Sequence, residues 1–389
     1  MGLAVKARAK PFLSPKAQVR FWWLFVHRWL GLALLVPMAM LGVTGSALVW
    51  PAATEIWLNP QRAVAADADP ARIEARHIAA ARAGLAGHGP VSAVLIGEPG
   101  FPMMFGTAPI APPHMGLGPP TRMTAYIDPV SGRLLDTKRS TGDFMWFMHA
   151  IHGHLLLSGV GRPVVGVMGI FLLLSAITGL VIWWPGRGRL WAALRWQRRE
   201  GRLLNLHRQS GVILSLVLIV EAVSGVWISF PTFFAALVEP SAVHAAGGHG
   251  GDARGAQRRG DGLPPPVIAD QQWVDVLSRA QAAYPGRPTS IAAPKAAGDA
   301  WEVAMNGARG PATLRIPEAG PVAVELAANG ASNASRWEAA MTGVHAASIG
   351  GPIWQWLSFL SGIALTFLSL SGLYVWGKRQ IMRGRRGVG

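Results

Sequence analysis

Four histidines recur at matched positions along the chain, and their spacing indicates paired metal ligands. His27 and His207 are 180 residues apart, whereas His152 and His345 are 193 residues apart. The chain has no cysteine, which excludes thiolate metal sites, iron–sulfur clusters and covalent haem attachment through C-x-x-C-H. An imidazole on each of two facing helices supplies both axial ligands of a low-spin haem. The pattern therefore predicts two non-covalent, b-type haem sites, one per histidine pair.

The neighbours of these histidines repeat as well. His27-Arg28-x-x-Gly31 matches His207-Arg208-x-x-Gly211 at the first spacing, and Thr178-Gly179-Leu180 matches Ser371-Gly372-Leu373 at the second. Matches at fixed spacing over most of a chain indicate internal duplication. The repeated unit reads as a helix, an outer domain and a second helix, and each helix brings one histidine of the set.

Four stretches are long and apolar enough to hold these histidines at the surfaces of a membrane. Residues are 51% hydrophobic and only 14% charged, and the stretches lie at about 27–50, 163–185, 207–230 and 353–376. A helix needs about 20 apolar residues to cross a bilayer. His27 and His207 then fall at one face of the membrane, and His152 and His345 fall at the other. We expect none of the four spans to be broken.

The net charge of +16 is concentrated in both terminal tails and in the loop around 186–206. The segments 51–160 and 231–340 are nearly balanced in charge. By the positive-inside rule, the termini and that loop are cytoplasmic, and the balanced segments lie outside. The basic residues thus label topology, and we expect a lipid bilayer rather than a nucleic acid as partner.

The two outer segments carry strand and turn signals. Helices are expected at 71–84 and 270–284. Strands are expected near 91–96, 101–106, 124–135 (two strands), 288–293, 301–305, 312–316 and 321–326. Two loops of biased composition interrupt these elements: 102–120, which contains Met103, Met104, His114 and Met115, and the Gly- and His-rich run 245–262. The first is interpreted as a flexible flap over a substrate or a soft-metal site.

Several neighbouring residues leave alternatives open. His149 shares a helix face with His152, so it is an alternative outer ligand or a substrate contact. Arg28, Arg208 and Arg162 either pair with haem propionates or extend to lipid headgroups. Glu221 lies 14 residues beyond His207, about 21 Å along a helix. Its carboxyl either moves protons or contacts a haem edge, or it is a neutral acid bonded to a hydroxyl such as that of Ser371.

The run Ala125-Tyr-Ile-Asp128-Pro129-x-x-Gly132-Arg-Leu-Leu resembles the end of a PepSY domain. With the paired His-Arg-x-x-Gly motifs and the Thr-Gly-Leu-x-x-Trp-Trp that closes the second span, the chain resembles the PepSY-associated transmembrane family, and in particular FoxB-type ferric-siderophore reductases. The resemblance implies a four-helix transmembrane bundle with two periplasmic α+β PepSY-like domains, internally duplicated. It also implies bound haem b and a ferric siderophore as substrate.

The expected organisation follows from these assignments. It comprises a cytoplasmic basic tail (1–20), a first span (21–50), a first PepSY-like domain (51–148), an outer histidine segment with the second span (149–185), a cytoplasmic basic loop (186–206), a third span (207–230), a second PepSY-like domain (231–340), an outer histidine segment with the fourth span (341–377) and a basic tail (378–389).

Two functions from different classes fit the sequence. The first is an enzyme of the bacterial inner membrane, a di-haem b-type electron-transfer protein that reduces a ferric siderophore or other ferric chelate in the periplasm. Its electrons come from a cytoplasmic reductase or from quinol, since no nucleotide-binding motif is present and the 186–206 loop is too short for such a domain. The second is a non-enzymatic membrane anchor whose PepSY domains bind a protease or another envelope protein. Unbroken spans with a single acid disfavour a third function, metal transport.

Overall fold

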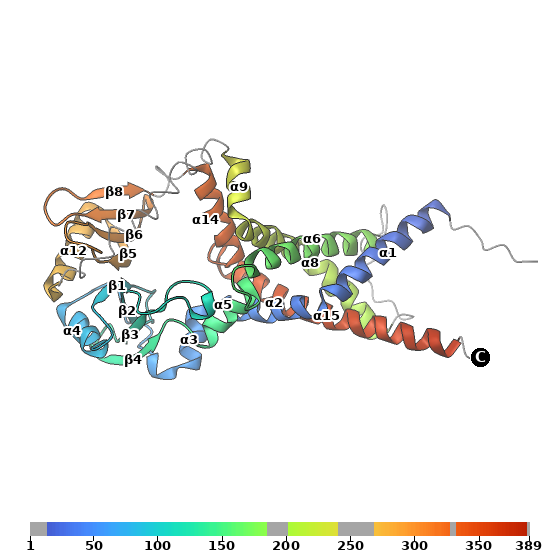
Figure 1. Ribbon diagram of the computed structural model, residues 1–389, viewed down its shortest axis with the longest axis horizontal. Helices are drawn as coiled ribbons and strands as arrows, with labels where there is room; N and C mark the ends of the chain where they lie inside the picture. The colour runs from blue at the N-terminus through green and yellow to red at the C-terminus, as the bar shows by residue number, and fades with distance from the viewer. Residues whose placement is uncertain (1–13, 185–200, 240–267, 327–331, 387–389) are drawn as a thin grey trace, which may run out of the picture. The chain divides into compact units, whose positions relative to one another are not determined.

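The computed structural model describes residues 14–184, 201–239, 268–326 and 332–386 (Figure 1). The chain divides into two compact units. The first consists of Met1–Ser46, Gly166–Val226 and Ala347–Gly389, and the second of Ala47–Val165 and Trp227–Ala346. Each unit is assembled from both halves of the sequence. The loop 245–262 lies outside the described residues.

The first unit contains the membrane-spanning helices. Three helices are long and apolar enough to cross a bilayer within the described chain: α6 (Gly161–Trp183), α8 (Arg202–Ser229) and α15 (Gly351–Arg386, apolar over Gly351–Lys378). A fourth crossing results if α1 (Pro15–Ala33) and α2 (Leu35–Ala47) are taken together. The protein is therefore a multi-pass membrane protein.

The expectation of unbroken spans was wrong for the first of them. Helices α1 and α2 meet at an angle of 66° around Leu34. Pro37 explains the position of this bend, because a proline has no N–H for the helix and its ring clashes with the carbonyl four residues earlier, here that of Ala33. Because the first span is broken, intact spans no longer disfavour metal transport as a function.

Helices α2 and α15 pack closely through small residues. A Cβ placed on Gly42 would lie 2.5 Å from the carbonyl oxygen of Gly362, a distance no side chain tolerates. The Ser46 hydroxyl donates a hydrogen bond to the carbonyl of Phe359 at 3.0 Å. Small and hydroxylic residues bring helices together where lipid provides no hydrophobic driving force.

The second unit is built on one antiparallel sheet of eight strands in the order β4-β3-β2-β1-β5-β6-β7-β8. The strands are β1 (Val91–Leu95), β2 (Met103–Thr107), β3 (Met123–Ile127), β4 (Leu134–Arg139), β5 (Gly286–Ala292), β6 (Trp301–Gly307), β7 (Gly310–Ile316) and β8 (Ala323–Leu326). The two halves join at β1 and β5, where Val94 lies opposite Ile291. Sequence patterns assigned the halves to separate domains, whereas in the structure their strands belong to one sheet.

Helices α4 (Ala75–Gly84) and α12 (Asp270–Ala283) contact each other and the sheet. Their apolar residues share one core with the strands, in which Ile78, Val94, Trp273, Ile291 and Leu314 are fully buried. Expected strands and helices thus fall where the period-two and helical patterns placed them. Met103 and Met104 belong to β2, as the expected strand 101–106 predicted, and not to the flap expected over 102–120; Met103 is buried in this core.

Short helices complete both halves in the same order. The first half has α3 (Pro51–Leu58), the 3-10 turns η1 (Pro60–Arg62) and η2 (His114–Gly116), and α5 (Phe144–His154). The second has α9 (Pro231–Val238) and α14 (Asn333–His345). In each half a span leads to a short helix that begins with proline, then to a helix on the sheet, four strands, a histidine-bearing helix and another span. The arrangement of elements therefore reflects the duplication in the sequence.

Candidate functional sites

His27 and His207 lie in the wall of a single cavity inside the membrane unit. Helix α1 provides His27 and α8 provides His207, and the two rings are close enough to interact electrostatically. The cavity has a volume of about 750 Å³. That size falls within the range of roughly 300–1,000 Å³ typical of cofactor pockets. The remaining wall includes Arg28, Arg208, Gly31, Gly211, Gly179 and Gly372.

Both rings are fixed through Nδ1. Nδ1 of His27 lies 3.0 Å from the carbonyl oxygen of Ser175 and 3.0 Å from Oγ1 of Thr178, and Nδ1 of His207 lies 2.8 Å from Oγ of Ser371. Neither Nε2 has a hydrogen-bond partner within the described chain. A histidine that ligates a metal commonly donates its other N–H to a carbonyl or hydroxyl, which sets the tautomer and the ring orientation. Both inner histidines therefore have the contacts expected of Nε2 ligands.

Glycines make room for these rings. A Cβ on Gly179 would lie 3.2 Å from Cε1 of His27, and one on Gly372 would lie 3.8 Å from Cε1 of His207. A Cβ on Gly31 would meet nothing within 4 Å, so this glycine borders open space. In both repeats the hydroxyl contacts a ring, whereas only Gly179 lies so close to its ring that a side chain would displace it.

The outer histidines meet inside the second unit. His152 lies near the end of α5 and His345 is the last residue of α14, and their ring centroids are 5.9 Å apart with the planes inclined by 44°. An iron bound by two imidazoles at roughly 2 Å each would separate the centroids by about 6 Å. The spacing therefore fits a bis-imidazole site. A residue in the left-handed region lies shortly after each helix: Leu155 (φ 49°) directly follows α5, and Ala347 (φ 51°) is the second residue after α14.

His149 is the alternative outer ligand, but the ring beside that of His345 belongs to His152. His149 is exposed, and its Nδ1 lies 3.1 Å from the carbonyl oxygen of Met145 in the same helix. His154 is half-buried, and burial together with the charge of Arg162 lowers its pKa. The structure therefore brings His152 rather than His149 to His345, as the duplication predicted.

The family model for the PepSY-associated TM region matches residues 23–379, nearly the whole chain. The chain belongs to the PepSY-associated TM region family. A resemblance to FoxB-type reductases is consistent with that membership. Comparison with curated proteins gives no match.

The arginines of this PepSY-associated protein have distinct surroundings. Arg28 and Arg208 line the inner cavity, and Arg208 also donates to Oδ1 of the fully buried Asn205 at 3.1 Å. Arg162 donates from Nε to the carbonyl oxygen of Ile228 at 3.1 Å. Two of the three candidate propionate partners thus stand at the inner site. The third, Arg162, instead satisfies a carbonyl near the end of α8.

Glu221 accepts a hydrogen bond at Oε1 from the Ser358 hydroxyl at 2.7 Å. Ser371, the hydroxyl named as a partner from sequence, instead contacts His207. Ser358 lies 13 residues before Ser371 on α15, just as Glu221 lies 14 residues after His207 on α8. Because α8 and α15 run in opposite directions, the register that places His207 beside Ser371 also places Glu221 beside Ser358. The carboxyl of Glu221 therefore has a hydroxyl partner on α15.

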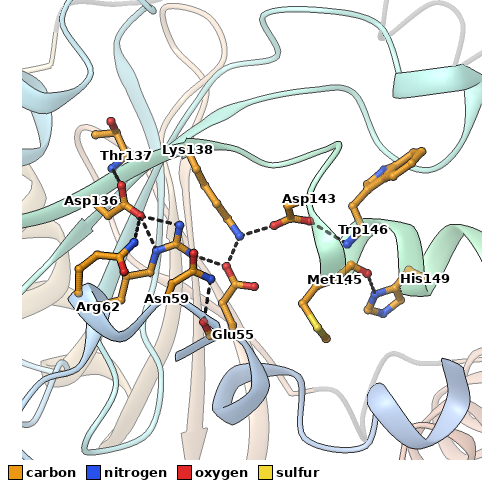
Figure 2. A network of polar contacts seen from close by, with 11 residues as sticks. Glu55, Asn59, Arg62, Asp136, Thr137, Lys138, Asp143, Met145, Trp146 and His149 are labelled. Atoms are coloured by element: carbon orange, nitrogen blue, oxygen red, sulfur yellow. Dashed lines mark hydrogen bonds and ion pairs between the residues drawn. The ribbon is translucent and has the colours of Figure 1, made fainter. Parts of the chain in front are cut away.

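A partly buried ionic network beside α5 was not anticipated from the sequence (Figure 2). Arg62, of which 3% is exposed, bridges Glu55 and Asp136, and Lys138 bridges Glu55 and Asp143. Asp143 in turn caps α5, since its Oδ1 accepts from the Trp146 amide at 2.8 Å. These residues are scattered over 55–143, and no local motif marks them. The network ties α3, η1 and β4 to the helix that carries His152.

Two ionisable groups in this network are shifted by their partners. Burial alone would lower the pKa of Lys138, but its hydrogen bonds to Asp143 and Glu55 raise that pKa above its ordinary value. Burial alone would raise the pKa of Asp136, but the hydrogen bond and charge of Arg62 lower it. Both groups are therefore held in their charged forms.

No cluster of three or more His, Asp or Glu side chains suited to a metal ion occurs in the described ranges. The histidine pairs supply two protein ligands each, which suits a metal whose other ligands come from a macrocycle. The donor set therefore fits haem better than a free metal ion.

Proposed function

We propose that the protein is a di-haem b-type electron-transfer protein of the bacterial inner membrane that reduces a ferric chelate, such as a ferric siderophore, in the periplasm. The observation that carries this proposal is the 5.9 Å separation of His152 and His345, matched by a second histidine pair at one cavity. When bound, haem b supplies a one-electron carrier at each pair.

Different residues of the chain would ligate the haems, orient the ligands and pair with the propionates. His27 and His207 hold the inner site, and His152 and His345 the outer one. Thr178 and Ser371 orient the inner rings, while Arg28 and Arg208 lie where anionic propionates would need partners. Four spans, a four-helix arrangement, two PepSY-like halves and cytoplasmic termini complete the proposed topology, so that electrons run outward from a cytoplasmic reductase or membrane quinol.

Reduction is a chemically sufficient release step. One electron added to a bound Fe(III) gives Fe(II), which hard oxygen ligands hold less strongly, so the metal leaves and the chelator remains intact. One quinol would supply two such electrons and release two protons. Exposed His149, on the same helix as the outer ligand His152, is the candidate contact for the incoming chelate.

A visible spectrum of the purified protein tests the proposal. We expect split low-spin bands that sharpen on dithionite reduction, with two haems per chain. The reduced protein should then be reoxidised by a ferric siderophore, and a chromogenic Fe(II) chelator should report one Fe(II) per electron. A colourless preparation would instead favour the non-enzymatic PepSY anchor.

Ligand assignment has a matched pair of variants. His152→Ala should lose one of the two haems, whereas His149→Ala, on the same helix, should retain both. Loss of a haem in His149→Ala alone would reverse the assignment.

A further inference from the structure

Two short helices follow directly on membrane spans. Pro51 begins α3 four residues after α2 ends at Ala47, and Pro231 begins α9 two residues after α8 ends at Ser229. Four residues reach at most about 14 Å, so the start of each helix lies within that distance of the end of its span. Both helices must therefore start close to the membrane surface at which these spans end.

Each helix exposes large apolar side chains on one side. Trp57 on α3 is 79% exposed, and on α9 Leu237 is 67% and Phe233 62% exposed. Trp57 and Leu237 hold the same position in the 180-residue repeat. Exposed apolar surface of this kind marks a contact with a partner or a membrane. Tryptophan in particular favours the boundary between lipid and water.

Each helix is also linked to a histidine-bearing helix: α9 contacts α14 directly, and α3 is joined to the N-terminal cap of α5 through Lys138. On α3, Glu55 precedes Trp57 by two residues, about 200° around the helix, and joins the ionic network that ends at the α5 cap Asp143 (Figure 2). On α9, Phe234 stacks on Trp227 with centroids 4.4 Å apart, and Trp227 lies 5.8 Å from Trp337 of α14. The C-cap residue Glu239 also accepts from the Ala334 amide of α14 at 3.3 Å.

We propose that α3 and α9 are interfacial helices whose exposed faces lie among the lipid headgroups and upper acyl chains. The partner is the bilayer itself, because both helices continue chain segments that leave it and both expose large apolar side chains. Through these links they fix the level of α5 and α14, and hence of His152 and His345, relative to the membrane surface. The lipid contact does not depend on haem.

Because the chain contains no cysteine, a single introduced cysteine can be labelled without labelling any other residue. Trp57→Cys and Leu237→Cys are each labelled with a nitroxide in the full chain, reconstituted in phosphatidylcholine nanodiscs. Power-saturation EPR then compares collisions with oxygen, which concentrates in lipid, and with a water-soluble nickel chelate. Val130→Cys, in the turn between β3 and β4 and 60% exposed, is the aqueous control. We expect nickel accessibility at positions 57 and 237 to be several-fold lower than at 130, and oxygen accessibility to be higher.

Nickel accessibility at 57 and 237 equal to that at 130 would overturn the proposal. Low accessibility to both reagents would do so too, since it would indicate that a second copy or another protein covers these faces. Should the cysteine variants fold poorly, brominated lipids provide a second measurement. They should quench a smaller share of the fluorescence of Trp57→Phe than of the wild type, and an unchanged share would contradict lipid contact by α3.

Discussion

Oγ of Ser371 accepts a hydrogen bond from Nδ1 of His207 across 2.8 Å, between two helices that are 164 residues apart in sequence. The serine hydroxyl itself donates to the carbonyl of Leu368 at 3.3 Å, which leaves its oxygen as acceptor for the ring. Thr178 stands in the same relation to His27 and donates to the carbonyl of Ser175 at 2.9 Å. The hydroxyls thus fix both rings with Nε2 as the remaining ligand atom.

Ser371→Ala should weaken haem binding at the inner site. Loss of a hydrogen-bond partner behind a metal-ligating histidine typically reduces metal affinity about 10–100-fold, because the ring is no longer oriented. Titration of haem into the apo-protein should show this loss of affinity for one of the two haems. Ser369→Ala is the matched control, because Ser369 lines the same cavity without a bond to either ring. Equal haem affinities in the two variants would show that Ser371 does not orient the ring of His207.

The two ring-facing glycines should differ in tolerance to alanine. At Gly179 the new Cβ would lie 3.2 Å from Cε1 of His27, inside the normal carbon–carbon contact of about 3.5–4.0 Å, so the ring must shift. At Gly372 the corresponding distance to His207 is 3.8 Å, an ordinary contact. Gly179→Ala should therefore alter the EPR signal or the occupancy of the inner haem, while Gly372→Ala should leave both unchanged. Equal effects in the two variants would mean that ring clearance is not what the glycines provide.

Repetition carried most of the sequence information on the candidate site. The two offsets paired His27 with His207 and His152 with His345, because duplicated helices place equivalent residues in equivalent surroundings. The hydroxyl groups that contact the two inner rings were not assigned from the sequence. The outer strands were also predictable, since alternation of apolar residues is a local signal. The first span could have been predicted as broken, because Pro37 lies within it.

Other features depend on contacts that no local pattern encodes. The union of β1 with β5 joins edges from different halves, and nothing in Val94 or Ile291 distinguishes a paired strand from a free edge. The choice of Ser358 as partner of Glu221 depends on the register between α8 and α15. The network around Arg62 requires α3 and β4 to meet.

Arg62→Met should destabilise the second unit strongly. Arg62 is buried between Glu55 and Asp136, with its Cζ 4.2 Å from the centre of the Tyr126 ring. Removing one partner of a buried pair leaves uncompensated charge and typically costs about 3–5 kcal/mol. Amide hydrogen exchange over β4 and α5 should accelerate accordingly. The exposed Arg133→Met should change the free energy of unfolding by less than about 0.5 kcal/mol, and a similar value for Arg62→Met would show that the network adds little.

His77 should make the sheet-bearing unit less stable in mild acid. The ring is fully buried, and its Nδ1 accepts from the Glu74 amide at 2.9 Å at the start of α4. Burial, together with the charge of Arg76, lowers the pKa of His77 below 6.5. Below pH 6.5 the ring binds a proton in the unfolded chain but not in the folded one. The free energy of unfolding therefore decreases as the pH is lowered from 6.5 to the folded-state pKa, by up to about 1.4 kcal/mol per pH unit.

This pH effect can be located by amide exchange over α4 between pH 7.5 and 5.5, corrected for the intrinsic exchange rate. His77→Gln should flatten the dependence, whereas His88→Gln, at an exposed position, should retain it. The nearby Asp128 does not titrate in this range: burial would raise its pKa, but hydrogen bonds from Val130 and Ser131 bring it below the ordinary value, and the carboxylate stays ionised. A slope unchanged in His77→Gln would mean that another group, such as the outer histidine pair, is responsible for the acid sensitivity.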